Sequence, residues 1–367
     1  MQTVKKLSNQ RSEKGSQIYR SETNGFDSRK ATHIFYIFVQ TMLEVIFVCT
    51  AISELGSGHL FGRTLDLECS YNECVCIVPR GFEIKFLHEQ SVSSYAIIGT
   101  CHIEGEVPLF YDAMNECGLC MAGLNFPELA KYNEVVTGQI NVASYELIAF
   151  VLRQCKDASS AVSLLKRINI TSESFSASLP CTPMHWIIAD KSGCYVIEQT
   201  KRGLEICENP LRVLTNAPEF SYHLTNACNY MGLSSNPPKS ALTLDYELSA
   251  YSRGLGAFGL PGDFSSASRL VRAVFAKNHA SADSDEIRRF FSILNTVYIP
   301  LGCVKTDTGR DVCTIYTSCM SSKTGNYYFS LYGSKRIMCV RLYDVNLNGN
   351  SLFVYDMRAD NEYKFLN

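Results

Sequence analysis

After residue 49, apolar residues gather in short segments that are rich in β-branched and aromatic side chains and are separated by turn residues. This pattern is typical of β-strands packed against a core. We therefore expect strands in CTAIS, HLFGRTLDL, ECVCIVPR, SYAIIGT, CGLCMAGL, MHWIIAD, GCYVIEQT and GLEICE, and near the C-terminus in CTIYTSCMSSKTGNYYFSLYG and IMCVRLYDV.

Between these groups of strands, apolar residues recur at helical spacing. Residues 144–168 have this period, and Asp157 is a plausible cap between two helices there. Two more helices are expected in SSASRLVRAVFAKN and SDEIRRFFSILNTV. Groups of strands that alternate with pairs of helices favour an α+β fold, with helices packed on sheets, over a regular βαβ winding.

The first 48 residues differ from the rest of the chain. Residues 1–31 are polar without an apolar period, which predicts a disordered tail. The segment 34–48 is apolar but is interrupted by polar residues, and it is shorter than the roughly 18 residues needed to span a bilayer. A secretory signal fits poorly, because Ile46 and Val48 stand where small residues would be expected. We expect an extension over 1–48 and a single domain over 49–367.

Composition narrows the function further. The 367 residues include 46% hydrophobic and 19% charged positions, as in a globular protein, and the formal net charge of −2 supplies no basic surface for nucleic acid. The 16 cysteines are scattered, which indicates reduced, mostly buried thiols and a cytoplasmic location, with secretion as the alternative. Cys117 and Cys120 form one C-x-x-C pair without a second, so we interpret them as structural thiols.

Residues 254–259 read GLGAFG, which matches the glycine pattern of dinucleotide-binding loops. That motif requires a preceding strand and a helix that opens within it. Here Pro261 follows directly and blocks helix continuation. A flexible glycine-rich loop is the better interpretation.

A cysteine–histidine pair is a second candidate for chemistry, with Cys49 or Cys181 as the nucleophile and His185 as the base. His185 lies within the strand-like segment MHWIIAD. We expect it to pack in the sheet or cap a strand.

A third arrangement centres on Cys49 alone. If cleavage leaves Cys49 as the first residue, it supplies both a thiol nucleophile and an α-amine, whose ordinary pKa of about 8 suits a general base. Such a site needs a carboxylate to hold the amine, a cation to favour thiolate and donors for an oxyanion. Arg63 and Asp66 could supply the first two, although their spacing also fits an exposed pair.

Several motifs in register resemble one family. They are CTAIS, FGRTLDLECSYN, DAMNECGLCMAGLNFP, HWIIAD, VIEQT, VLTNAPEF, GLPGDFSSASRLVR and YTSCM. From Cys49 to the C-terminal strands the chain is similar to the choloylglycine hydrolases, which comprise bile salt hydrolases and penicillin V acylases. The resemblance implies the four-layer αββα sandwich of the N-terminal nucleophile hydrolases.

The resemblance also assigns roles to single residues. It implies that Cys49 is the nucleophile with its own amine as base, that Arg63 stands beside the thiol and that Asp66 holds the amine. Three further residues complete the site. Asn216 would donate its side-chain amide to the oxyanion hole, Asn125 would line that hole with a backbone N–H as donor, and Arg269 would organise the site.

The implied reaction is hydrolysis of a C–N amide bond through a thioester, with no metal or organic cofactor. In a conjugated bile salt the products would be a free bile acid and glycine or taurine, and the preference between these conjugates stays open. Asn125 is the residue type of bile salt hydrolases, where penicillin V acylases have tyrosine, so bile salts are favoured over penicillin V. The resemblance also implies a homotetramer, and no stable membrane insertion is expected.

The extension departs from the family pattern, because members commonly start Met-Cys or carry a very short propeptide. Cys49 has no free amine while residues 1–48 remain attached. The extension is then either a propeptide removed between Val48 and Cys49, or the result of a start assigned too far upstream. Even a start at Met42 would still require cleavage. A third account is an unprocessed, non-catalytic protein that binds bile salts.

Overall fold

The computed structural model describes residues 48–90, 95–282 and 285–358. The expected tail and all but the last residue of the expected extension lie outside these ranges. From Val48 onward the described residues belong to one compact unit. Within them, no helix is both long and apolar enough to cross a membrane.

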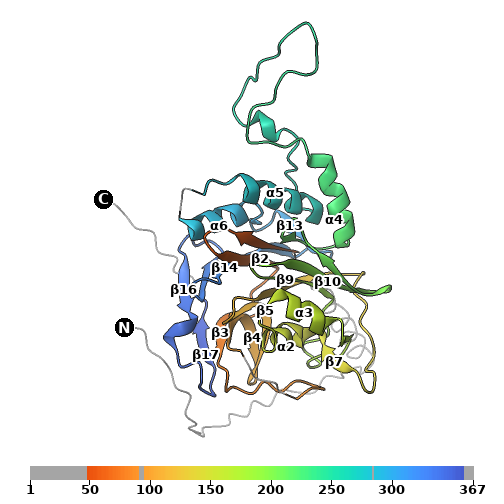
Figure 1. Cartoon of the computed structure of the whole chain (residues 1–367), viewed down its shortest axis with the longest axis vertical. Helices are drawn as coiled ribbons and strands as arrows, with labels where there is room; N and C mark the ends of the chain where they lie inside the picture. Colours follow the sequence, from red (N-terminus) through yellow and green to blue (C-terminus); the bar gives the residue numbers. More distant parts are fainter. Residues whose placement is uncertain (1–47, 91–94, 283–284, 359–367) are drawn as a thin grey trace, which may run out of the picture. The chain divides into compact units, whose positions relative to one another are not determined.

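Two antiparallel sheets form the centre of this unit (Figure 1). Sheet one runs in the order β12-β1-β2-β14-β15-β16, and β13 pairs with β14 at one side. Its strands are β1 (Val48–Leu55), β2 (His59–Leu67), β12 (Val213–Leu214), β13 (Val304–Lys305), β14 (Asp311–Ser321), β15 (Asn326–Leu331) and β16 (Met338–Arg341).

Sheet two runs in the order β11-β10-β9-β6-β5-β4-β3-β17. Its strands are β3 (Cys74–Val78), β4 (Ile97–Glu104), β5 (Val107–Asn115), β6 (Cys120–Asn125), β9 (Met184–Ala189), β10 (Cys194–Thr200), β11 (Gly203–Glu208) and β17 (Phe353–Asp356). A separate parallel pair joins β7 (Ile140–Ala143) to β8 (Ile168–Thr171).

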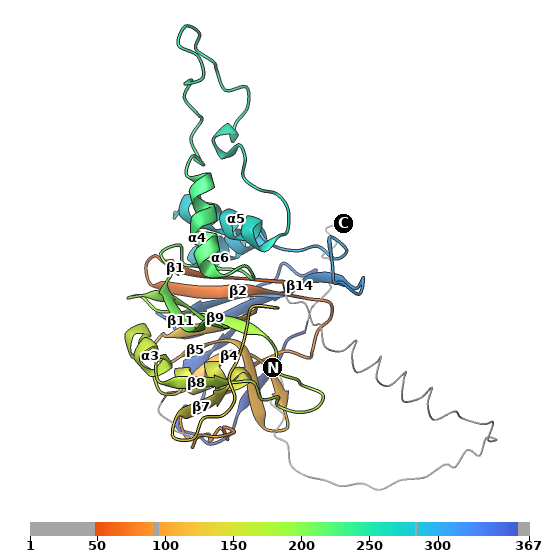
Figure 2. The same cartoon turned by 90° about the vertical axis from the view of Figure 1, so that its right-hand side faces the viewer.

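Helices cover the outer faces of both sheets (Figure 2). They are α2 (Leu147–Leu152) and α3 (Ala158–Leu165) on sheet two, and α5 (Ser266–His279) and α6 (Glu286–Asn295) on sheet one, with α4 (Phe220–Ala227) beside α5. The expectation of helices packed on sheets in an αββα sandwich is therefore confirmed. At residue 157 the expected cap is present, because the Asp157 side chain accepts the Ser160 N–H at the start of α3.

Three hydrophobic clusters fill the three spaces between these four layers. Ile52 and Leu60 of sheet one pack with Leu270 of α5 and Phe290 of α6. Their neighbours on the opposite face of the same strands, such as Phe61, meet sheet two. Successive side chains of a strand point to opposite faces, so β1 and β2 each contribute residues to both of these clusters. Both strands are buried on both faces, so any polar side chain within them needs a partner inside the protein.

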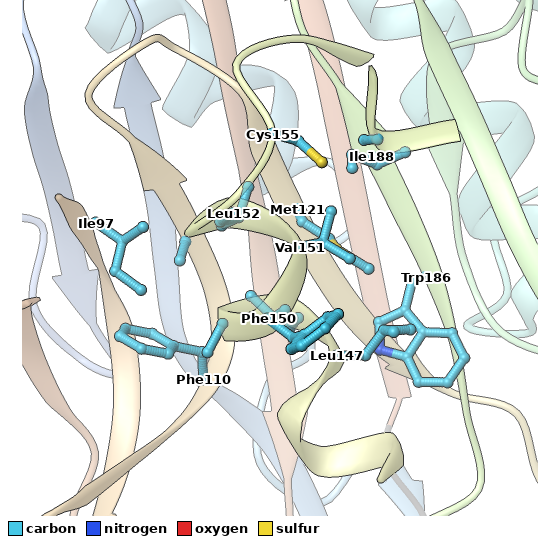
Figure 3. Packing of buried hydrophobic residues seen from close by; sticks show 14 of the residues in the cluster. Ile97, Phe110, Met121, Leu147, Phe150, Val151, Leu152, Cys155, Trp186 and Ile188 are labelled. Carbon is cyan, nitrogen blue, oxygen red and sulfur yellow. The ribbon is translucent and has the colours of Figure 1, made fainter. Parts of the chain in front are cut away.

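The third cluster lies between sheet two and α2, and Figure 3 shows its packing. Leu147, Val151 and Leu152 of α2 face Met121 and Trp186 of the sheet. α2 is only six residues long and all of them are buried. It is therefore stabilised by this packing and not by its own length.

Some elements differ from the sequence-based expectations. The expected strands did not include β5, β12, β13, β17 or the β7–β8 pair, and α4 was not expected either. β5 is nine residues long and was simply missed, whereas the other elements are short and carry little local signal. Gly254 has a φ of 79°, and residues Leu255–Ala257 form a 3-10 turn. The described elements just before this turn are α4 and a 3-10 turn at Cys228–Tyr230, not a strand. The GLGAFG motif therefore lacks the strand-to-helix setting of a dinucleotide site.

Candidate active site

The six residues singled out in the sequence come from five elements or their ends. Cys49 lies in β1, and Arg63 and Asp66 lie in the neighbouring β2. The remaining three arrive from the other sheet, a loop and a helix. Asn125 ends β6, Asn216 follows β12, and Arg269 lies in the first turns of α5. All six side chains are buried.

Cys49 is fully buried between the two sheets, and its backbone is held at both of its polar groups. Its N–H donates to Oδ1 of Asn216 at 2.9 Å. Its carbonyl oxygen accepts a hydrogen bond from Nη1 of Arg269. Two residues more than 160 positions away in the chain thus hold the two peptide groups that flank the Cys49 Cα.

Arg269 connects the parts of the site. Besides the Cys49 carbonyl, Nη1 donates to Oγ1 of Thr50 at 2.7 Å, and Nη2 donates to Oδ1 of Asn216 at 2.7 Å. Nε donates to the Phe264 carbonyl at 3.0 Å. Burial lowers the pKa of Arg269 to about 10, which still leaves the guanidinium charged at neutral pH. A planar guanidinium can hold these four acceptors at once, because it reaches them from three different nitrogens.

Asn216 joins β1 to sheet two. Its Oδ1 accepts from both Cys49 and Arg269, while Nδ2 donates to the Asn125 carbonyl at 2.9 Å. Its backbone N–H donates to Oγ of Ser266 at 2.9 Å, at the start of α5. The Asn216 amide plane is therefore fixed at both ends. The contact to Asn125 runs through its carbonyl, and the role of its backbone N–H as a donor stays a prediction.

Arg63 acts on the Cys49 thiol from β2, and its side chain reaches across to sheet two. Its Nη1 donates to the carbonyls of Tyr111 at 3.1 Å and Gly123 at 2.5 Å. Its Nη2 is buried and has no hydrogen-bond partner among the described residues. Burial alone would lower the pKa of Arg63, but the nearby Cys49, Tyr316 and Asp112 groups raise it above its ordinary value. The guanidinium is thus a fixed cation.

Asp66 is the buried carboxylate of the site. Val48 is its direct neighbour across the β1–β2 ladder, and the charge of Asp66 acts on the thiol of the next residue, Cys49. Burial raises the pKa of Asp66 to about 6, while the charge of Arg269 and hydrogen bonds from Thr314 and Thr64 oppose this rise. The group therefore changes charge close to neutral pH.

Opposing effects act on the Cys49 thiol. Burial raises its pKa, and the charge of Asp66 raises it further. The Arg63 cation lowers the pKa, as do the Asp66 backbone and Arg269. Burial outweighs the two guanidinium groups, so the pKa of the buried Cys49 thiol is raised overall. Arg63 and Arg269 limit this rise, because a nearby cation favours the thiolate form.

The cysteine–histidine alternative has a different geometry. Nδ1 of His185 lies 3.0 Å from Oε1 of Glu198, and Nε2 lies 2.9 Å from the Thr215 carbonyl. The ring also stacks on Phe126, with centroids 4.3 Å apart. Cys181 instead contacts Ser144, at 3.4 Å from Sγ to Oγ. His185 thus packs in the sheet, as the sequence led us to expect, and both of its ring nitrogens have protein neighbours.

Sequence reasoning missed the residues that support the six. Thr50, Thr314 and Ser266 contact Arg269, Asp66 and Asn216 respectively. Thr50 and Ser266 lie within the quoted motifs CTAIS and GLPGDFSSASRLVR, but nothing in the motifs assigned them a role. Thr314 lies outside the quoted motifs, and the pairing of β14 with β2 is the signal that reveals it. No group of three His, Cys, Asp or Glu side chains within the described ranges could hold a metal ion.

All 16 cysteines lie in the described part of the chain, and each is a free thiol there. Most of the buried ones lie on strands, for example Cys74 and Cys76 on β3. Cys117 and Cys120 are free as well, with Cys117 exposed and Cys120 buried.

Comparison with known proteins places this geometry in context. Residues 49–355 match the model of the linear amide C–N hydrolases, choloylglycine hydrolase family. A protein from Lactiplantibacillus plantarum named bile salt hydrolase/transferase is 39% identical over 324 residues, which cover 87% of this chain and 100% of that protein.

Solved structures show the same relationship. A variant of the conjugated bile acid hydrolase from Clostridium perfringens superposes with a TM-score of 0.81 at 34% identity, covering 87% of this chain and 100% of that one. The penicillin V acylase from Agrobacterium tumefaciens superposes with a TM-score of 0.67 at 20% identity, covering 84% and 91%, and so shows a shared fold alone.

The family match begins at Cys49, the residue on which the buried contacts of Asn216 and Arg269 converge. It extends over most of the chain, and a relative is aligned over its full length. The chain therefore belongs to the choloylglycine hydrolase family of linear amide C–N hydrolases.

Proposed function

We propose that this chain hydrolyses the amide bond of conjugated bile salts, with Cys49 as the nucleophile. The names of its relatives support the substrate class. The observation that carries the proposal is the convergence of Asn216 and Arg269 on the backbone of Cys49, with Arg63 and Asp66 beside it. A buried cysteine in a purely structural role would not need two guanidinium groups and a carboxylate around it.

The first half of the reaction forms a thioester. The α-amine of Cys49 takes the thiol proton as the sulfur attacks the amide carbonyl, a C–S bond forms, and negative charge moves onto the carbonyl oxygen. Hydrogen-bond donors that are already in place stabilise that charge, and the Asn216 amide and the Asn125 backbone are the donors that we propose. The α-ammonium of Cys49 then gives a proton to the leaving nitrogen as the C–N bond breaks, which releases glycine or taurine.

The second half reverses the proton flow. The α-amine of Cys49 takes a proton from water, and the resulting hydroxide attacks the thioester carbon. The C–S bond breaks, the free bile acid leaves, and the Cys49 ammonium returns its proton to the sulfur, which regenerates the thiol and the amine. Asp66 would hold the ammonium form between these steps, because it is the carboxylate that pairs with Val48 across the ladder and acts on Cys49.

The amine exists only after the Val48–Cys49 peptide is cut, so we propose that residues 1–48 form a propeptide and that 49–367 form one catalytic domain. Attack of the Cys49 sulfur on the Val48 carbonyl would move the acyl group from nitrogen to sulfur. The nitrogen would gain a proton, and water would hydrolyse the thioester. Asn216 and Arg269 already hold the groups on either side of Cys Cα.

Intact mass combined with activity tests this proposal. The purified protein should have the mass of a chain that starts at Cys49 and should release glycine from glycocholate. Cys49→Ser should abolish thioester-dependent turnover. A parent mass of residues 1–367 would contradict the propeptide account, and equal turnover by Cys49→Ser would contradict the nucleophile.

The same assay separates the alternatives. Glycocholate, taurocholate and penicillin V are compared on the parent under identical conditions. Preference for penicillin V would overturn the substrate assignment that rests on Asn125. Bile-salt binding without turnover by a processed chain would instead favour a non-catalytic binding protein.

We also propose reducing, cytoplasmic surroundings and a homo-oligomer, the tetramer of the family resemblance. The 16 free thiols support the first. The segment between α4 and α5 lies outside the layers (Figure 2) and supports the second, because it exposes large apolar side chains. These are Met231, Leu242, Leu244, Tyr246, Tyr251 and Phe258. Sedimentation of the purified chain measures the assembly.

A further inference from the structure

Asp66 has to be a carboxylate to hold an amine, yet its burial favours the protonated form. Its side chain is fully buried and its pKa is raised to about 6. The groups that keep it charged are therefore as important as Asp66 itself. Two of them are hydroxyl donors that the proposed reaction does not otherwise use.

The stronger donor is Thr314 of β14, which is buried directly opposite Asp66 in the β14–β2 ladder. Its Oγ1 donates to Oδ1 of Asp66 at 2.6 Å. The same Oγ1 accepts the backbone N–H of Ile299 at 2.9 Å. A hydroxyl has one proton, and Ile299 contributes its own proton to the second contact. The Thr314 proton is therefore directed at Asp66.

The other oxygen has a weaker donor. Oγ1 of Thr64, two residues earlier on the same strand, donates to Oδ2 of Asp66 at 3.1 Å. Each carboxylate oxygen thus receives one hydroxyl hydrogen bond, which fixes the rotation of the group. Thr314 also connects Asp66 of β2 to Ile299, because the Thr314 backbone N–H donates to the Ile299 carbonyl at 3.1 Å.

We propose that Thr314 is a positioning residue whose hydroxyl holds the Asp66 carboxylate in the charged form and orientation that the α-amine of Cys49 requires. This inference rests on the proposed function. Thr314 acts through Asp66 and does not contact the reacting atoms. The other charged or titratable groups that act on or beside Asp66 are Arg269, Arg63, Cys49, Tyr298 and Cys313.

Two substitutions separate the hydroxyl from the methyl group. Thr314→Val keeps the shape and removes the donor, whereas Thr314→Ser keeps the donor and removes the methyl group. A hydrogen bond to a charged group corresponds to a shift of roughly one to two pH units. In the pH profile of kcat/KM for glycocholate, we expect Thr314→Val to move the acid limb to a higher pH by about that amount. At pH values above this limb, KM should stay unchanged. Thr314→Ser should keep the acid limb of the parent.

A substrate-free measurement keeps this test separate from the proposed function. In protein labelled with ¹³C at its aspartate carboxyls, the Asp66 signal is assigned by its loss in Asp66→Asn, and its titration is followed from about pH 4 to about pH 9. The midpoint should rise in Thr314→Val and stay in Thr314→Ser. This readout does not require that bile salts are substrates.

Matched variants complete the design. Thr317 is equally buried on β14 and, within the described structure, makes no hydrogen bond to Asp66, so Thr317→Val should leave the midpoint in place. Thr64→Val should give a smaller shift than Thr314→Val, and it replaces that variant if Thr314→Val does not fold. An unshifted midpoint in Thr314→Val, or an equal shift in Thr314→Ser, would overturn the inference.

Discussion

Replacing Arg269 with lysine tests the structural logic of the site most directly. The variant keeps the positive charge but replaces a planar fork of donors with a single nitrogen. In the parent, the guanidinium donates to the carbonyls of Phe264 and Cys49, to Oγ1 of Thr50 and to Oδ1 of Asn216. One ammonium group cannot serve all the acceptors that the parent reaches from three different nitrogens.

The magnitude follows from the contacts that are lost. A hydrogen bond to a charged group contributes about 1.5–3 kcal/mol, so the loss of about two should lower the free energy of unfolding by roughly 3–6 kcal/mol. The effect on catalysis comes through Asn216, whose amide would no longer be held from the Arg269 side. A displacement of about 1 Å costs about 100-fold in rate, so we expect kcat to fall roughly 100-fold and KM to stay within about threefold.

The assay is steady-state release of glycine from glycocholate, with urea unfolding measured in parallel. Arg272→Lys is the matched control. Arg272 lies one turn further along α5 and donates to the backbone carbonyls of Thr296, Pro261 and Asp263, away from Cys49. The Arg272→Lys variant should therefore be less stable than the parent, while its kcat stays near the parent value. A kcat for Arg269→Lys close to that of Arg272→Lys would refute the reasoning.

Two further predictions concern the titrating groups of the site. For Asp66→Asn we expect loss of hydrolysis together with higher stability at neutral pH. The folded pKa of Asp66, about 6, exceeds the ordinary 3.8, so the stability that Asp66 contributes is full below pH 3.8 and is lost as pH rises through 6. Urea unfolding of parent and variant at several pH values measures this dependence. An Asp66→Asn variant that is less stable than the parent at neutral pH would contradict it. For His185→Gln we expect about 1–2 kcal/mol of destabilisation, from the lost contacts to Glu198 and Thr215, with hydrolysis retained. Abolished turnover in a folded His185→Gln protein would revive a cysteine–histidine mechanism.

The local pattern predicted the elements that carry their own signal. The apolar residues of α5 and α6 recur at helical spacing, and Asp157 marks the capped start of α3. The strands β1 and β2 were equally visible as apolar, β-branched segments. In contrast, α4 and β17 are short and exist because they pack against residues far away in the chain, so no local window contains the information.

The chain sequence by itself determined the layered α+β class and the family, because apolar periodicity and motif order survive in one dimension. It also nominated Cys49, Arg63, Asp66, Asn125, Asn216 and Arg269. The tertiary structure decided how these residues act on one another. Arg269 reaches Cys49 across 220 positions, and Thr314 reaches Asp66 across 248. Hydrogen bonds and charge depend on ångström distances and on burial, and those quantities exist only after the two sheets and α5 have closed around the thiol.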